Sequence, residues 1–358
     1  MRRWQNRMAE SSATLPAACV VATLLWWLPQ GGYSTRYLLG WLTCALTTYL
    51  LLEMTAQNAL LRVRSRMISS LFLFVMAVCG FLHPLQTGSV AMFCVCLSFY
   101  SLLHTYEESR PEVDTLHAYL ALSMGSLLWP PLLLLALVQW WSQGVYLRSL
   151  TRRSFGASLI GLILPYVIWA TIAFALGRMP YLIDHFIAII TPFTEPWYWQ
   201  WAIDKAQSLE EGIPFATAFS TISSAIYDHI KAQCLAHPTE ATALAFVLLL
   251  SLTGFIHYVR KSYDDKIRVR MCHYTLMAMQ VVLILWLALE PQLFYILFPL
   301  LIVCTVPAAA HFMALTHTWL TNAWVIILIL LLIATGVCCL ALPSFLDWPQ
   351  PTLLNAPF

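Results

Sequence analysis

The stretch WVIILILLLIATGVCCLAL, from Trp324 to Leu342, is apolar almost throughout and contains no charged residue. An α-helix needs about 20 such residues to cross the ~30 Å hydrocarbon core of a bilayer, because each residue rises about 1.5 Å. The run is continuous and rich in Leu and Ile, without the polar alternation that is typical of a barrel strand. It therefore predicts a transmembrane helix.

Comparable apolar runs recur along the whole chain, which is 60% hydrophobic and only 10% charged. A soluble domain carries about 25% charged residues, so most of this surface faces something other than water. In lipid, only helices and closed barrels satisfy every backbone hydrogen bond. The sequence thus predicts an all-α, polytopic transmembrane helical bundle of about nine full spans. They lie near 15–28, 37–59, 67–82, 88–105, 157–176, 241–259, 271–289, 292–310 and 318–341.

Residues 115–141 differ from the other apolar runs because Trp129-Pro130-Pro131 interrupts them. Proline removes a backbone donor and breaks a helix, and each remaining arm is too short to cross the membrane alone. We therefore expect a proline-broken re-entrant hairpin, which enters the membrane and leaves it on the same side.

Charge supports this hairpin, because Lys and Arg gather in cytoplasmic loops of membrane proteins. With the N-terminus in the cytoplasm and the hairpin in place, most basic residues fall inside. A single crossing at 115–141 would reverse every later loop. We therefore predict a cytoplasmic N-terminus and a C-terminus on the outer side of the membrane. The basic residues left outside are Arg36, Arg178, Lys205 and Lys231.

Four regions follow from this layout. Residues 1–177 form an N-terminal transmembrane half, 178–240 an extracytoplasmic segment, 241–341 the C-terminal helices, and 342–358 an extracytoplasmic tail. Within the second region, apolar residues from Ile213 to Ile230 recur at helical spacing, which predicts an amphipathic helix.

Other classes of site find little support in the sequence. Nine of the ten cysteines lie inside apolar runs, so we interpret them as packing residues rather than as disulfides. The histidines and cysteines show no metal-ligand spacing, and no cofactor motif is evident. No basic stripe with interleaved aromatic residues indicates nucleic-acid binding. The lipid bilayer is the first expected partner, and other membrane proteins are possible ones.

Four carboxylates are candidates for catalysis. Asp184, Asp204 and Glu290 fall on the outer side, and Glu53 lies within an apolar run, where a charge is costly. Two of them have a plainer interpretation. Glu290 precedes a proline at a turn between helices. Glu53 precedes polar residues that suit the cytoplasmic interface, and if it is buried we expect it to make a structural hydrogen bond.

The motif PWYWQW, Pro196 to Trp201, is the main candidate binding element. Its aromatic side chains could stack against a sugar or a lipid headgroup, and Arg36 in the first outer loop is a further candidate. The alternative is an aromatic belt at the membrane interface, which Trp and Tyr form in membrane proteins generally. The four aromatic candidates are Trp197, Tyr198, Trp199 and Trp201.

The stretch from Leu38 to Trp141 resembles the first half of the C-type (GT-C) glycosyltransferases, polytopic enzymes that use polyprenyl-phosphate-linked sugars. The resemblance rests on SVAMFCVCLSFYSLLHTYEES, then the hairpin LALSMGSLLWPPLLLLAL, then the basic loop LRSLTRR. Late in the chain, LFYILFPLLIVCTVPAAAHF resembles the proline-containing helix of that family. The layout is also similar to that of an uncharacterised inner-membrane family of Bacteroidota.

The resemblance implies a GT-C-like fold in the bacterial inner membrane, with a periplasmic C-terminus, and a role in cell-envelope glycan or lipid-linked sugar metabolism. Such enzymes carry an acidic residue in the first outer loop, whereas the corresponding loop here, PQGGYSTRY, has neither Asp nor Glu. Three functions stay open: a membrane glycosyltransferase, a non-catalytic scaffold or subunit of an envelope complex, and a transporter or flippase. The last predicts internal repeats and paired intramembrane charges, which are not apparent in the sequence.

Overall fold

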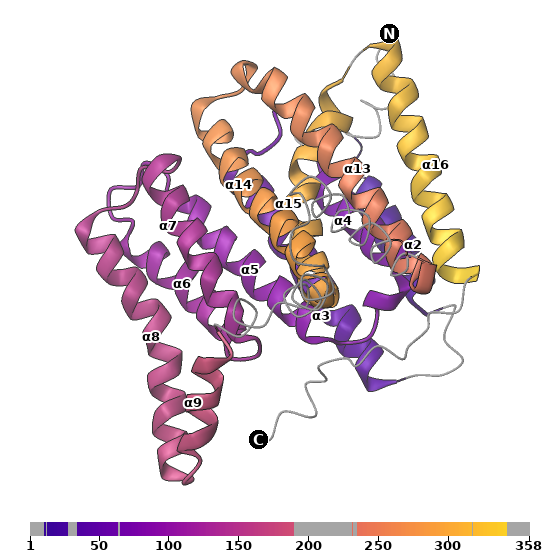
Figure 1. Cartoon of the computed structure of the whole chain (residues 1–358). Coiled ribbons are helices and arrows are strands. Elements are labelled where there is room, and N and C mark those ends of the chain that lie inside the picture. The colour runs from indigo at the N-terminus through magenta and orange to yellow at the C-terminus, as the bar shows by residue number, and fades with distance from the viewer. Residues whose placement is uncertain are drawn as a thin grey trace, which may run out of the picture.

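The computed structural model describes residues 11, 13–27, 34–63, 65–189, 231, 235–316 and 318–341, and all regular structure in them is helical (Figure 1). Short 3-10 helices η1 (Gly80–Leu82), η2 (Pro130–Leu134), η3 (Ser262–Asp264) and η4 (Pro291–Leu293) join some of the twelve α-helices. The α-helices are α2 (Thr14–Trp27), α3 (Thr35–Asn58), α4 (Met67–Val78), α5 (Thr87–His104), α6 (Glu112–Ser126), α7 (Leu135–Val145), α8 (Arg152–Ala175), α9 (Met179–Ile187), α13 (Pro238–Lys261), α14 (Ile267–Leu289), α15 (Phe294–Leu315) and α16 (Trp319–Ala341).

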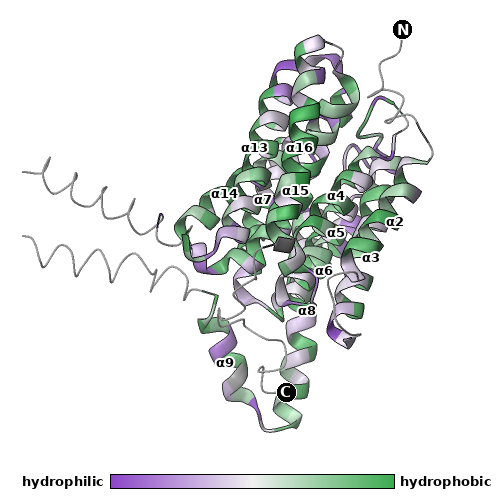
Figure 2. Cartoon of the chain, turned by 90° about the vertical axis from the view of Figure 1, so that its right-hand side faces the viewer, coloured by the Kyte–Doolittle hydropathy of each residue, from purple (hydrophilic) through white to green (hydrophobic). Residues whose placement is uncertain are grey.

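Seven of these helices are long and apolar enough to cross a membrane: α3, α5, α8, α13, α14, α15 and α16. The apolar colour in Figure 2 runs along much of α13 to α16. The all-α, multi-pass character predicted from the sequence is therefore confirmed. Helices α2 and α4, where the sequence predicts two more spans, are apolar but have only 14 and 12 residues. The predicted amphipathic helix from Ile213 to Ile230 and the tail 342–358 lie outside the described residues.

Helix α15 is the centre of the bundle, and nearly all of its side chains are buried. It packs against α4, α5, α13 and α14. The backbones of α5 and α13 approach it closely, each at one glycine. A Cβ atom at Gly88 would lie 2.0 Å from the carbonyl oxygen of Tyr295, and one at Gly254 would lie 2.8 Å from the nitrogen of Ala309. Only glycine fits at such positions without a shift of one backbone.

Helices α6 and α7 form the hairpin that the prolines predict. Helix α6 ends at Ser126, Trp129 adopts an extended conformation, and η2 starts at Pro130. The two arms run back along each other, because Tyr119 on α6 donates to the Gln143 side chain on α7 at 3.1 Å. The loops before and after the hairpin also meet, since the hydroxyls of Thr105 and Ser149 share a hydrogen bond of 2.9 Å. The chain thus enters and leaves this unit at the same end.

Helix α8 begins at Arg152, several residues before the predicted start near Ala157. Thr151 and Ser154 form a reciprocal capping box, which satisfies the free N–H groups of the first turn. The short helix α9 follows α8 within the segment predicted as extracytoplasmic, and the sequence pattern did not indicate it. It packs back on α8 through the rings of Tyr166 and Phe186, whose centroids are 5.2 Å apart.

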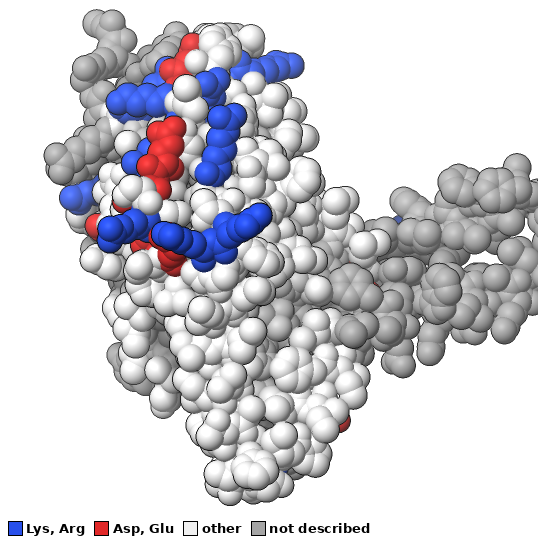
Figure 3. Space-filling model, turned by 90° about the vertical axis from the view of Figure 1, so that its left-hand side faces the viewer, with Lys and Arg blue, Asp and Glu red and all other residues white. Residues whose placement is uncertain are grey.

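Basic residues gather at one end of the bundle, which we call the basic end. It holds the α3–α4, α5–α6, α7–α8 and α13–α14 loops. These loops meet through the Thr105–Ser149 bond, an Arg62–Asp265 ion pair and the rings of Tyr146 and Tyr274. Figure 3 shows this gathering of Lys and Arg, with a mostly uncharged surface below it. At the opposite end, the Leu85 N–H donates to the Arg36 carbonyl.

Candidate functional site

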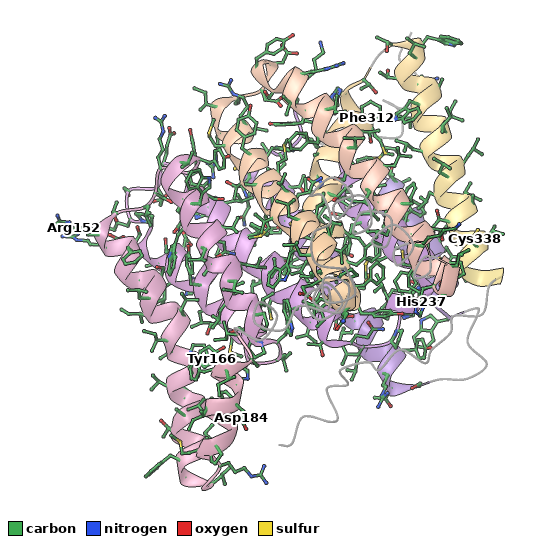
Figure 4. The ribbon with its side chains drawn as sticks, in the orientation of Figure 1. Arg152, Tyr166, Asp184, His237, Phe312 and Cys338 are labelled. Carbon is green, nitrogen blue, oxygen red and sulfur yellow. The ribbon has the colours of Figure 1, made fainter. Side chains whose placement is uncertain are left out.

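The carboxylates predicted from the sequence do not all come together. Asp184 is exposed on α9, and Figure 4 shows it at the far end of the α8–α9 unit from Arg152. Glu290 lies between α14 and α15 and is buried, and this burial raises the pKa of its carboxyl group. Asp204 lies outside the described residues, as do the aromatic candidates of the PWYWQW motif.

The other two predicted residues, Glu53 and Arg36, lie on α3 and have few polar contacts. Glu53 is half-buried on α3 and accepts a hydrogen bond of 3.1 Å from Gln57, which also donates to Tyr100 at 2.7 Å. This arrangement matches the structural hydrogen bond that is the plainer interpretation of Glu53. The Arg36 side chain is exposed at the start of α3, and its carbonyl oxygen joins this helix to the α4–α5 loop.

Glu240, which was not among the candidates, is a buried carboxylate at the end opposite the basic end. Tyr295 of α15 donates to one of its oxygens at 2.8 Å, and Thr239 donates to the other at 2.5 Å. The sequence does not indicate that Glu240 is buried, because this residue lies at the boundary between a polar segment and an apolar run. The structure makes it a second buried carboxylate in that region, besides Glu290.

The most highly connected polar group lies at the basic end, around Asp265 in the α13–α14 loop. The Asp265 carboxylate accepts hydrogen bonds from Nε of Arg62, in the α3–α4 loop, and from Nε2 of His311, on α15, the latter at 3.0 Å. Side-chain exposure is 1% for both Asp265 and His311 and 40% for Arg62. We call these three residues the ionic latch, because they join three separate elements.

The surroundings of the ionic latch explain the charge of its carboxylate. Burial by itself raises the pKa of Asp265, but the hydrogen bonds and charges of His311 and Arg62 outweigh it and lower the pKa to about 2. Asp265 is therefore ionised at neutral pH. Two further histidines lie beside the latch, with ring centroids 5.6 Å from that of His311: His257 on α13 and His273 on α14.

A groove of about 590 Å³ opens on the surface between α7, α13 and α14. Its lining is mostly apolar and includes exposed side chains such as Trp141, Val259 and Val281, so the groove faces the surroundings of the bundle. Two tyrosines, Tyr146 and Tyr274, line it near the basic end, and their ring centroids are 5.9 Å apart. Within a membrane, such a groove is open to lipid chains.

A basic side chain, Arg270, lies on α14 near the tyrosine end of the groove in the sequence. Arg270 lies one helical turn before Tyr274 and therefore on the same face of α14. Its Nε atom is buried and has no hydrogen-bond partner among the described residues. A buried donor without a partner is costly. The Arg270 guanidinium also keeps its positive charge on the face of α14 that carries Tyr274.

The α13–α14 loop links the ionic latch to the groove. The Tyr274 hydroxyl shares a hydrogen bond of 2.9 Å with Ser262, three residues before Asp265 in the same loop. Together, the latch, Arg270 and the groove form a candidate site in which an apolar lining lies near fixed positive charge. The sequence alone does not predict that Asp265 pairs with Arg62 and His311, because the three residues are far apart along the chain.

No protein-family model matches the chain, and comparisons with curated proteins and with solved structures give no match.

Proposed function

We propose that this multi-pass membrane protein binds a phosphate-bearing anionic lipid in the groove between α7, α13 and α14. In this proposal it acts as a GT-C-like component of envelope glycan or lipid-linked sugar metabolism in the bacterial inner membrane. The observation that carries the proposal is the groove itself, which is mostly apolar and has two tyrosines near the basic end. Arg270 lies one helical turn before Tyr274, towards that end.

Each part of such a lipid finds a matching surface. The apolar lining suits an acyl or isoprenoid chain, and the volume of about 590 Å³ lies within the usual range of ligand sites. Tyrosines are frequent at the level of lipid headgroups, where Tyr146 and Tyr274 would lie. A basic side chain near an anionic membrane surface contributes about 1 kcal/mol of attraction, and Arg270 is positioned for such a role.

The proposed orientation follows from the same distribution of charge. Most described Lys and Arg residues lie at the basic end, so the positive-inside rule places this end in the cytoplasm. The groove then opens to the inner leaflet, the N-terminus is cytoplasmic and the C-terminus is periplasmic. In this arrangement α6 and α7 form the re-entrant hairpin, and the shorter apolar helices α2 and α4 run between the two ends of the bundle beside the seven long spans.

The direct test is lipid binding by the purified protein in nanodiscs, measured by native mass spectrometry. We expect phosphatidylglycerol or a polyprenyl phosphate to be retained over phosphatidylcholine. Comparing the first two shows whether the groove prefers an acyl or an isoprenoid chain. Val281→Trp fills the groove and should abolish retention, whereas Val337→Trp, on an exposed face of α16, is the matched control. Equal retention of all three lipids by the wild type would refute the proposal.

A second candidate, enzymatic function, is favoured by Glu240. This buried carboxylate is held by Tyr295 in the region where a GT-C-like enzyme would need an acidic residue. Lipid-linked sugars in a deletion strain would be profiled by mass spectrometry after complementation with Glu240→Gln, Glu290→Gln or Asp184→Asn. Accumulation of one lipid-linked sugar with a single variant indicates catalysis. Full complementation by all three favours a non-catalytic subunit or scaffold.

A further inference from the structure

The loop that contains Ser262 and Asp265 is fastened on two sides. On one side, the Asp265 carboxylate pairs with Arg62 and His311. On the other side, the Ser262 hydroxyl is bonded to Tyr274, which lines the groove. The two loop residues are also joined directly, because the N–H of Asp265 donates to the carbonyl of Ser262 at 3.1 Å.

A second path runs through aromatic rings. The ring of His311 meets the ring of Tyr258 edge-on, with centroids 4.9 Å apart. Tyr258 in turn stacks on His273 at 4.3 Å and meets the ring of Tyr274 edge-on at 6.1 Å. Protein interiors are close-packed, so a shift of His311 is transmitted along these rings rather than absorbed in empty space.

We infer that the ionic latch regulates lipid binding by setting the position of Tyr274 in the groove. While Asp265 is paired with Arg62 and His311, the loop keeps Ser262 hydrogen-bonded to the Tyr274 hydroxyl. The tyrosine end of the groove then has the shape that accepts the headgroup. When the latch opens, the loop is released and Tyr274 loses its fixed partner. This inference rests on the proposed function, because it concerns the same groove.

The coupling is reciprocal by thermodynamic necessity, so a lipid bound in the groove stabilises the closed latch to the same extent. No residue of the latch needs to touch the lipid. This separates the latch from Arg270, whose replacement would remove a contact with the headgroup itself. Couplings between sites are commonly about fivefold in affinity or more, and we expect at least this effect.

The test compares three variants for retention of phosphatidylglycerol in nanodiscs by native mass spectrometry. Asp265→Asn and Arg62→Gln both open the latch, and each should weaken binding by about fivefold or more. Asp264→Asn is the matched control, because this neighbouring carboxylate is 38% exposed and lies 3.8 Å from Arg62. It should leave binding unchanged. Arg62 is half-exposed, so its variant remains informative even if Asp265→Asn fails to fold.

A double-mutant cycle separates coupling from general loosening of the fold. Tyr274→Phe keeps the ring but removes the bond to Ser262, so it should weaken binding without breaking the latch. Combining it with Arg62→Gln should cost less than the sum of the two single losses, because both act through one loop. Fully additive losses, or unchanged binding by both latch variants, would overturn the regulatory role. Absence of any lipid preference in the wild type would instead refute the proposed function.

Discussion

Replacing Asp265 with Asn should cost about 2.5 kcal/mol of folding stability at neutral pH. The Asp265 pKa is about 2 in the folded chain, and an unperturbed Asp has a value of about 3.9. A difference of about two units corresponds to about 2.5 kcal/mol, because one unit is worth about 1.4 kcal/mol. Breaking a buried ion pair can cost more, about 3–5 kcal/mol, but the half-exposed Arg62 can still be hydrated.

The same difference in the Asp265 pKa predicts that folding stability depends on pH. Because the folded-state pKa is depressed, this stabilisation is fully present above pH ~4 and is lost as the pH falls from about 4 towards 2. Asp265→Asn has no carboxylate at this position, so its stability should lack this acid-dependent component. The charged and titratable groups around Asp265 are the same in both proteins. They are Arg62, Asp264, Tyr258, His257, His273 and His311.

The assay is unfolding in mixed micelles with increasing SDS, followed by a thiol-reactive fluorescent dye. Cys272 and Cys304 are fully buried in α14 and α15, so the dye reaches them only when the bundle opens. Asp264→Asn should change stability by no more than about 0.5 kcal/mol, as expected for an exposed pair. An equally small change for Asp265→Asn, with the acid dependence of the wild type retained, would refute the reasoning.

Two further predictions concern packing and orientation. Gly88→Ala should destabilise the bundle by at least about 2 kcal/mol, because its Cβ would lie 2.0 Å from the carbonyl oxygen of Tyr295. Gly156→Ala, in α8 with no atom within 4 Å of its Cβ, should stabilise the helix by up to about 1 kcal/mol, and the same SDS titration measures both. A membrane-impermeant thiol reagent added to spheroplasts should label Cys234 and miss a cysteine introduced at Arg152; the reverse pattern would contradict the proposed orientation.

The helices were predictable because their signal is local. Long apolar runs located all seven long spans, and the pair Pro130-Pro131 located the turn of the α6–α7 hairpin. Helix ends were less accurate where side-chain caps decide them, as at Thr151. The short helix α9 was missed, because a one-sided apolar pattern over so few residues is weak within a polar segment.

The ionic latch was not predictable in the same way. Asp265 stands in a charged stretch with Lys261, Lys266 and Arg268, which by itself suggests a solvated loop. His311 is an isolated histidine in an apolar helix, and its partner is set by how α15 packs against the α13–α14 loop. The sequence signal that remains is an acidic pair, Asp264 and Asp265, within an otherwise basic loop. Such a pair indicates partners elsewhere in the bundle.

The central place of α15 has a consequence for how the protein is made. During synthesis α15 follows α2 to α14, so the ring of helices around it is assembled before its central member arrives. Until then, Asp265 lacks His311, and the glycines at 88 and 254 face no partner backbone. A nascent chain that ends before α15 therefore has a carboxylate with one partner missing and two glycine-bearing helix faces without a neighbour. Insertion of this one helix converts it to a closed bundle.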